Sequence, residues 1–115
     1  MKLLIADDDG TNLAAYKALF KHQGLEVLTT PNGEEALRMI EEDSSIDALL
    51  TDFDMPGMSG LQLLYEVRKC RPKVRTFLGS GSLSENTSSH AKDFGAEATF
   101  QKPYDVEHIC SILKK

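Results

Sequence analysis

Short hydrophobic runs alternate with amphipathic stretches along the whole chain. An apolar run bounded by turn residues is typical of a buried strand, and hydrophobic residues that recur every three or four positions are typical of a helix. We expect strands at residues 2–6, 26–30, 47–51, 74–78 and 98–101, each followed by a helical pattern. This alternation predicts an α/β fold, with a parallel, doubly wound sheet covered by helices on both faces.

Residues with capping preferences mark the ends of the first two helices. We expect Thr11 or Asn12 to cap the first helix and Gly24 to end it. Asn32, followed three residues later by Glu35, resembles a capping box and predicts the start of the second helix.

The fourth helical stretch, residues 82–93, is the least regular of the five. It is rich in serine, which is a poor helix former, and Phe94-Gly95 is expected to end it. Asp105 is expected to cap the final helix.

Composition is consistent with one soluble globular domain over residues 1–115, without an output domain. The chain has 115 residues, 41% hydrophobic and 27% charged, and a net charge of −5, which argues against a direct nucleic-acid partner. No apolar segment approaches transmembrane length, so we expect no membrane partner and a cytoplasmic location. Cys70 and Cys110 lack metal-binding spacing and are expected to be reduced.

Reactive polar residues follow four of the five expected strands. The carboxyl ends of parallel strands meet at one edge of the sheet, where open α/β sheets bind their ligands. The side chains expected at that edge are four carboxylates, one hydroxyl and one ammonium: Asp7, Asp8, Asp52, Asp54, Ser80 and Lys102.

This set of side chains fits phosphoryl transfer to a carboxylate. Clustered carboxylates repel one another and favour a bound cation, and Mg²⁺ prefers oxygen ligands. A carboxylate beside Mg²⁺ can attack phosphorus, while Lys102, Ser80 with nearby backbone N–H groups, and the metal meet the three phosphoryl oxygens. We therefore expect Asp52 to be the phosphoacceptor, with Mg²⁺ as cofactor and Mn²⁺ as a substitute.

Four motifs in order, IADDD, LLTDFDMPGMSG, GSG and QKPY, resemble the receiver domain of two-component response regulators over the whole chain. The resemblance implies a flavodoxin-like (βα)5 three-layer sandwich with strand order 2-1-3-4-5. It also implies that Asp8, Asp52 and the backbone carbonyl of Asp54 hold Mg²⁺. Asp7 would act through a coordinated water, and the Lys102-Pro103 bond would be cis.

The chain departs from the family pattern around the residues that respond to phosphorylation. Family members commonly carry an aromatic residue three positions before the lysine, where this chain has Thr99, unless Phe100 or Tyr104 takes that role. Gly81 replaces the usual alanine and, with Gly79, predicts a loose end of the fourth strand. We hypothesise that the fourth helix is poorly ordered without phosphate and becomes ordered on activation.

The function implied is that of a phosphorelay receiver, with no enzymatic activity beyond its own phosphorylation and dephosphorylation. A sensor histidine kinase or a histidine phosphotransfer protein would donate to Asp52, and a downstream effector protein would read the changed surface. The protein is expected to be a monomer, or a dimer formed on phosphorylation through the fourth helix, fifth strand and fifth helix. It is expected to stand alone, with the excised receiver of a longer regulator or hybrid kinase as an alternative.

Two other classes remain open. A haloacid-dehalogenase-like phosphatase would use Asp52 as nucleophile and Asp54 as general acid and base. Against that class, Pro56-Gly57 departs from its motif, and the acidic pair Asp7-Asp8 lies upstream instead of downstream. A receiver-like module that binds without phosphorylation is disfavoured because every residue type of an acceptor site is present.

Overall fold

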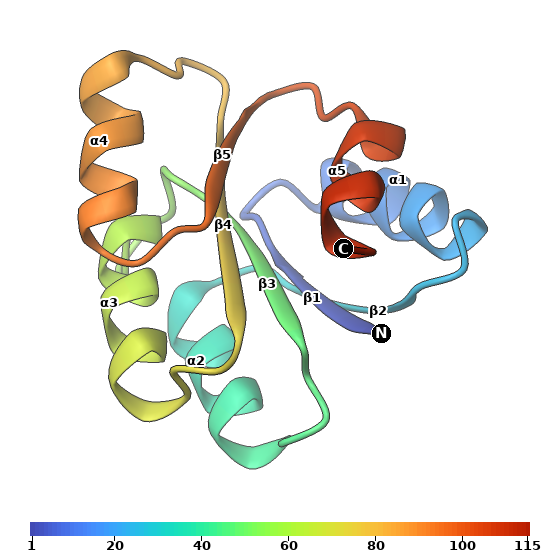
Figure 1. The fold of residues 1–115 in the computed structure, drawn as a ribbon, viewed down its shortest axis with the longest axis horizontal. Helices are drawn as coiled ribbons and strands as arrows, with labels where there is room; N and C mark the ends of the chain where they lie inside the picture. The colour runs from blue at the N-terminus through green and yellow to red at the C-terminus, as the bar shows by residue number, and fades with distance from the viewer.

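Residues 1–115 form a three-layer α/β sandwich in the computed structural model (Figure 1). The elements, in chain order, are β1 (Lys2–Ala6), α1 (Gly10–His22), β2 (Glu26–Thr30), α2 (Gly33–Glu42), β3 (Ala48–Asp52), α3 (Gly60–Cys70), β4 (Arg75–Ser80), α4 (Glu85–Asp93), β5 (Ala98–Gln101) and α5 (Val106–Leu113). Neighbouring strands are parallel, in the order β2-β1-β3-β4-β5. The predicted fold and strand order are confirmed.

The helices divide between the two faces of the sheet. Helices α1 and α5 bury Phe20 and Ile109 against one face (Figure 1). Helices α2, α3 and α4 cover the other, with Ile40, Leu63 and Ala91 buried beneath them. Because successive strand residues point to opposite faces, a sheet covered on both sides buries its central strands completely. All five residues of β3 are buried, so its last residue, Asp52, sits on a rigid support.

Strand β4 extends to Ser80, so the predicted strand 74–78 begins one residue too early and ends two residues too early. The strand continues through Gly79 and Ser80 because neighbours on both sides pair with it. Gly79 lies between Asp52 and Phe100 in the register, and Ser80 pairs with Gln101. The predicted third strand, 47–51, lies one residue too early.

The helix caps follow the expected residues with one correction. Asp9, and neither Thr11 nor Asn12, caps α1, since its carboxylate accepts both of their backbone N–H groups. Asn32 and Asp105 cap α2 and α5 as predicted.

Helix α4 is shorter than predicted and begins after a cap at Ser84. It ends at Phe94-Gly95 as expected, and Gly95 adopts a φ of 107° that favours glycine. Cys70 and Cys110 are free thiols. No helix combines the length and apolar character needed to cross a membrane.

Candidate functional site

Three carboxylates meet at the carboxyl edge of the sheet. Asp7 follows β1 and Asp52 ends β3, and these strands are neighbours. One carboxylate oxygen from each of Asp7, Asp8 and Asp52 lies within 4.8 Å of the other two. Asp7 and Asp52 are buried, whereas Asp8 is exposed. The cluster is therefore a candidate metal site that is open on one side.

Lys102 is the cation of this edge. Its Nζ lies 2.5 Å from Asp7 Oδ2 and 3.3 Å from Asp52 Oδ2, so one ammonium joins carboxylates from two strands. The expected cis bond between Lys102 and Pro103 is present.

The pKa shifts follow from burial and charge. Burial raises the pKa of Asp52, Lys102 opposes that rise, and the negative charge of Asp7 adds to it. Burial lowers the pKa of Lys102, but the hydrogen bond to Asp7 and the charge of Asp52 outweigh this effect, so the pKa is raised overall. The lysine stays charged. Its single positive charge does not balance the negative charges around the buried Asp52, and a divalent cation would supply the remainder.

Ser80 lies at the same edge of the sheet, but its hydroxyl forms no hydrogen bond with the acidic cluster. Its side chain is buried at the end of β4, and its Oγ accepts the backbone N–H of Ser82 at 3.1 Å. The side chain of Asp54 is exposed and lies outside the group of close carboxylates. Of the six expected residues, the structure thus joins Asp7, Asp8, Asp52 and Lys102 most closely.

Tyr104 contributes a feature that the sequence did not reveal. Its buried hydroxyl lies against Gly79, where a Cβ atom would overlap both the hydroxyl and the ring. Burial, followed by the charges of Asp52 and Asp7, raises the pKa of Tyr104 far above its usual value. The phenol therefore stays protonated beside the site. Only the glycine at position 79 hinted at this close approach.

The loop after Asp52 is held from two sides. Gly60 begins α3 so close to the strand that a Cβ atom would overlap the backbone carbonyl of Asp52. On the other side, Glu34 of α2 accepts the N–H of Met58 at 3.0 Å. The sequence gave no sign of these contacts.

The position that is commonly aromatic in the family is tied to α4 by hydroxyl groups. Thr99 Oγ1 lies 3.0 Å from Ser88 Oγ. Phe100 does not take the aromatic role at this position, because its ring stacks on Phe77 in the core under α1 and α5.

The sheet is doubly wound and parallel, with strand order 2-1-3-4-5, and its carboxyl edge carries an acidic cluster and a lysine bonded to it. These features define the class of flavodoxin-like signalling domains with an acidic centre. Within that class, the model of the response regulator receiver domain matches residues 3–114. The chain belongs to this family of two-component receivers, whose function is to be phosphorylated on an aspartate.

Relatives of known name agree with this assignment. The chain is 26% identical over 114 residues to sporulation initiation phosphotransferase F of Bacillus subtilis, covering 99% of this chain and 91% of the relative. It is 30% identical over 113 residues to the DNA-binding transcriptional regulator NtrC of Azospirillum brasilense, covering 98% of this chain but only 23% of that protein. The chain thus spans less than a quarter of the NtrC relative.

A solved structure gives the same result. The crystal structure of a response regulator receiver domain protein from Clostridium thermocellum has a TM-score of 0.91 and 31% sequence identity, covering 98% of this chain and 90% of that one.

Proposed function

We propose that Asp52 is the phosphoacceptor and that Asp7, Asp8 and Lys102 prepare it for the reaction. The observation that carries this proposal is the meeting of three carboxylate oxygens within 4.8 Å, with Lys102 Nζ 2.5 Å from Asp7. A carboxylate oxygen of Asp52 attacks phosphorus, the P–N bond of a phosphohistidine breaks, and the imidazole keeps the electron pair and takes up a proton.

The acidic residues fit Mg²⁺, which prefers carboxylate oxygens and would neutralise charge on the transferring phosphoryl group. Asp8, Asp52 and the backbone carbonyl of Asp54 would hold the ion, with Mn²⁺ as a substitute. Asp7 would act through a bound water while its other contacts orient it: it accepts N–H groups from Lys102 and Asp9.

Lys102 and Ser80 would meet the new phosphoryl group. Lys102 is already shared between Asp7 and Asp52, so a small movement brings its ammonium to a phosphoryl oxygen. The Ser80 hydroxyl can donate to a second oxygen while still accepting the Ser82 N–H. Both residues would therefore respond to phosphorylation directly.

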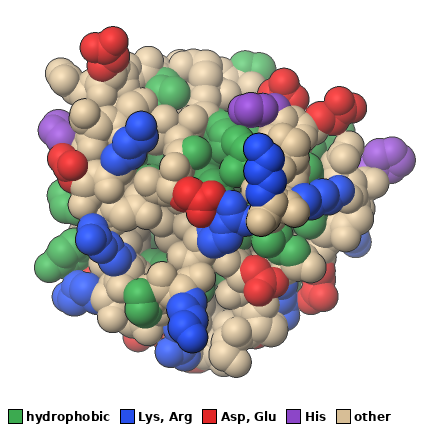
Figure 2. Space-filling view, viewed as in Figure 1, with side chains coloured by type: hydrophobic (Ala, Val, Ile, Leu, Met, Phe, Trp, Pro, Cys, Tyr) green, Lys and Arg blue, Asp and Glu red, His purple; other side chains and the backbone are tan.

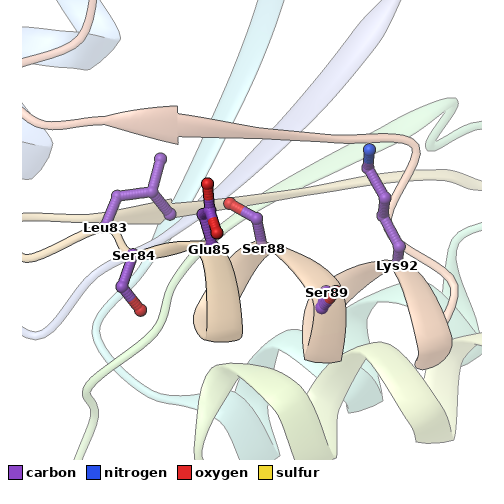
Figure 3. Close-up of a pocket in the computed structure, with 6 residues that line it drawn as sticks. All are labelled: Leu83, Ser84, Glu85, Ser88, Ser89 and Lys92. Carbon is purple, nitrogen blue, oxygen red and sulfur yellow. The ribbon is translucent and has the colours of Figure 1, made fainter.

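We infer that a sensor histidine kinase or a histidine phosphotransfer protein supplies the phosphoryl group and that an effector protein reads the result. A hollow of about 480 Å³ on α4 suits such a reader: it is lined by Leu83, Ser84, Glu85, Ser88, Ser89 and Lys92. Figure 3 shows Ser88 and Lys92 extending from α4 toward β5, so this surface would change with the α4–β5 contact. Phosphorylation-dependent dimerisation through α4, β5 and α5 would use the same face. These events would take place in the cytoplasm.

Counting transferred phosphate tests the proposal. With Mg²⁺ and a small phosphodonor, the protein should trap about one phosphate per chain and release it slowly. Asp52→Asn should trap none, and Asp54→Asn should still trap it because that side chain is exposed and away from the cluster. Turnover of many equivalents would instead indicate a phosphatase, and no trapping by the unmodified protein would indicate a binding module.

A further inference from the structure

A cluster of positive charge lies at the end of the molecule opposite the acidic site. Five of the thirteen Lys and Arg residues fall within residues 68–75, although the net charge of the chain is −5. These residues end α3 and begin β4, and so lie at the amino edge of the sheet. Figure 2 shows blue side chains gathered at the lower left, where α3 and the lower end of α4 lie in Figure 1.

An exposed aromatic pair borders this cluster. Tyr65 of α3 and Phe94 at the end of α4 pack edge to face, with ring centroids 6.1 Å apart. The two residues are 46% and 37% exposed, and they are two of the four large exposed hydrophobic residues of the protein. Lys69 Nζ stands 5.0 Å from the centre of the Tyr65 ring. The aromatic surface and the charge therefore form one continuous patch.

Much of the positive charge is left without a carboxylate. Arg75 pairs with Glu97, and Lys69 lies 3.8 Å from Glu66. Arg68 instead donates to the backbone carbonyl of Asp93, which leaves its charge unneutralised. Lys73 is exposed and forms no ion pair.

A pocket opens beside these cations. It has a volume of about 290 Å³ and is lined by Arg68, Pro72, Val74, Thr76 and Gly95. Arg68 uses one of its five N–H donors within the protein, so the others can bind a carboxylate at the pocket.

We propose that the α3–α4 patch, formed by Tyr65, Arg68, Lys69, Pro72, Lys73 and Phe94, binds an acidic segment of a partner protein that carries an aromatic or aliphatic anchor. Carboxylates of the segment pair with Arg68 and Lys73, and the anchor packs on the Tyr65–Phe94 rings. This arrangement combines the two residue types, aromatic side chains and arginine, that dominate binding energy at protein interfaces.

The size of the patch favours a protein partner over nucleic acid. Tight binding to a phosphate backbone uses about six to ten cationic contacts, whereas Lys69 and Arg75 already face carboxylates here. The patch also lies at the opposite end of the strands from Asp52, so binding does not require a phosphoryl group on Asp52. Failure of this inference would leave the phosphoacceptor proposal intact.

Selection from a displayed library of short random peptides tests the inference, followed by NMR titration of the selected peptide into the ¹⁵N-labelled protein. The expected peptides are net acidic with an aromatic or aliphatic residue, and the amide shifts fall within residues 65–76 and 92–97. Arg68→Glu with Lys73→Glu should weaken binding about tenfold or more, and Tyr65→Ser should weaken it at unchanged charge.

Lys17→Glu with Lys21→Glu, an equal charge change at exposed positions on α1, is the matched control and should bind as the unmodified protein does. Each variant is checked for an intact amide spectrum and for phosphate trapping at Asp52. Selected peptides that are neutral or basic, shifts elsewhere, or equal loss in the α1 control would overturn the inference. Tighter binding of a short oligothymidylate than of the peptide at the same residues would also overturn it.

Discussion

Gly79 and Tyr104 show how one residue makes room for another beside the site. The hydroxyl of Tyr104 occupies the space that any side chain at position 79 would need. Tyr104 follows Lys102-Pro103, and Lys102 Nζ lies 5.9 Å from the centre of its ring. The close packing of Tyr104 against Gly79 therefore helps to position Lys102 at the site.

Gly79→Ala should destabilise the protein by about 1–3 kcal/mol, because an overpacked core must displace the Tyr104 ring. It should also slow phosphate trapping, since Lys102 moves with Tyr104. Urea denaturation and the trapping rate measure the two effects. Gly81→Ala is the matched control: nothing lies within 4 Å of its Cβ position, and stability should be unchanged or rise by less than about 1 kcal/mol. Equal stabilities and trapping rates in the two variants would contradict the proposed packing of Tyr104 against Gly79.

Asp52→Asn should stabilise the protein at neutral pH in the presence of a chelator. Burial raises the pKa of Asp52 above its usual 3.8, so the folded state binds this proton more tightly than the unfolded state. Stability therefore falls as the pH rises from the unfolded pKa through the folded one, and the penalty persists above that interval.

Urea midpoints over a pH series measure the effect of Asp52→Asn. The gain should shrink as the pH falls from the raised folded pKa toward about 3.8, and it should be lost below that value, where the carboxyl is protonated in both states. Asp54→Asn, at an exposed position, should show no comparable gain. A variant Asp52→Asn that is less stable than the unmodified protein at neutral pH would contradict the account.

The identity of the reactive side chains was the part of the site that could best be predicted from the sequence. Asp7, Asp8 and Lys102 could be placed at one edge because each follows a recognisable strand. The contact between Tyr104 and Gly79 could not be predicted, because it depends on side-chain direction across segments that are distant along the chain. Asp9 was accessible in principle: Ser, Thr, Asn and Asp are all good caps, and local geometry decided among neighbouring candidates.

Among the elements, α4 has the weakest support for its structure. It is rich in serine, its cap is Ser84, and Ala91 is its one buried residue. The hydroxyl pair of Ser88 and Thr99 joins it to β5 where an aromatic residue is common in the family.

We expect α4 to gain protection from hydrogen exchange when Asp52 carries a phosphoryl mimic. Ordering of Ser80 around the mimic would tighten the turn that leads into residues 82–93. Amide exchange with and without beryllofluoride and Mg²⁺ measures this effect, with the amides of α1 as an internal reference. Unchanged protection in residues 82–93 would contradict the order–disorder hypothesis.

Strand β4 explains where prediction of the elements failed. Gly79 and Gly81 favour a loop when only local preferences are considered. Pairing with β3 and β5 overrides that preference, because Gly79 is held between Asp52 and Phe100. The five strands themselves were predictable, since hydrophobic runs buried on both faces give a strong signal.

For the whole molecule, the parallel sheet separates the two proposed sites at its two ends. The carboxyl edge carries Asp52 and the acidic cluster, and the amino edge carries the α3–α4 patch. The strand order that joins Asp7 to Asp52 could not be read from periodicity. It followed from the family resemblance, and the structure confirms it.

The central claim is that Asp52 is the one residue that accepts the phosphoryl group. Intact-mass spectrometry after incubation with Mg²⁺ and acetyl phosphate tests it most directly, using the unmodified protein, Asp52→Asn and Asp54→Asn. The account predicts that the unmodified protein and Asp54→Asn each gain the mass of one phosphoryl group, and that Asp52→Asn gains none. The gain should be absent when a chelator removes Mg²⁺. Phosphorylation that persists in Asp52→Asn, or that disappears only in Asp54→Asn, would contradict it.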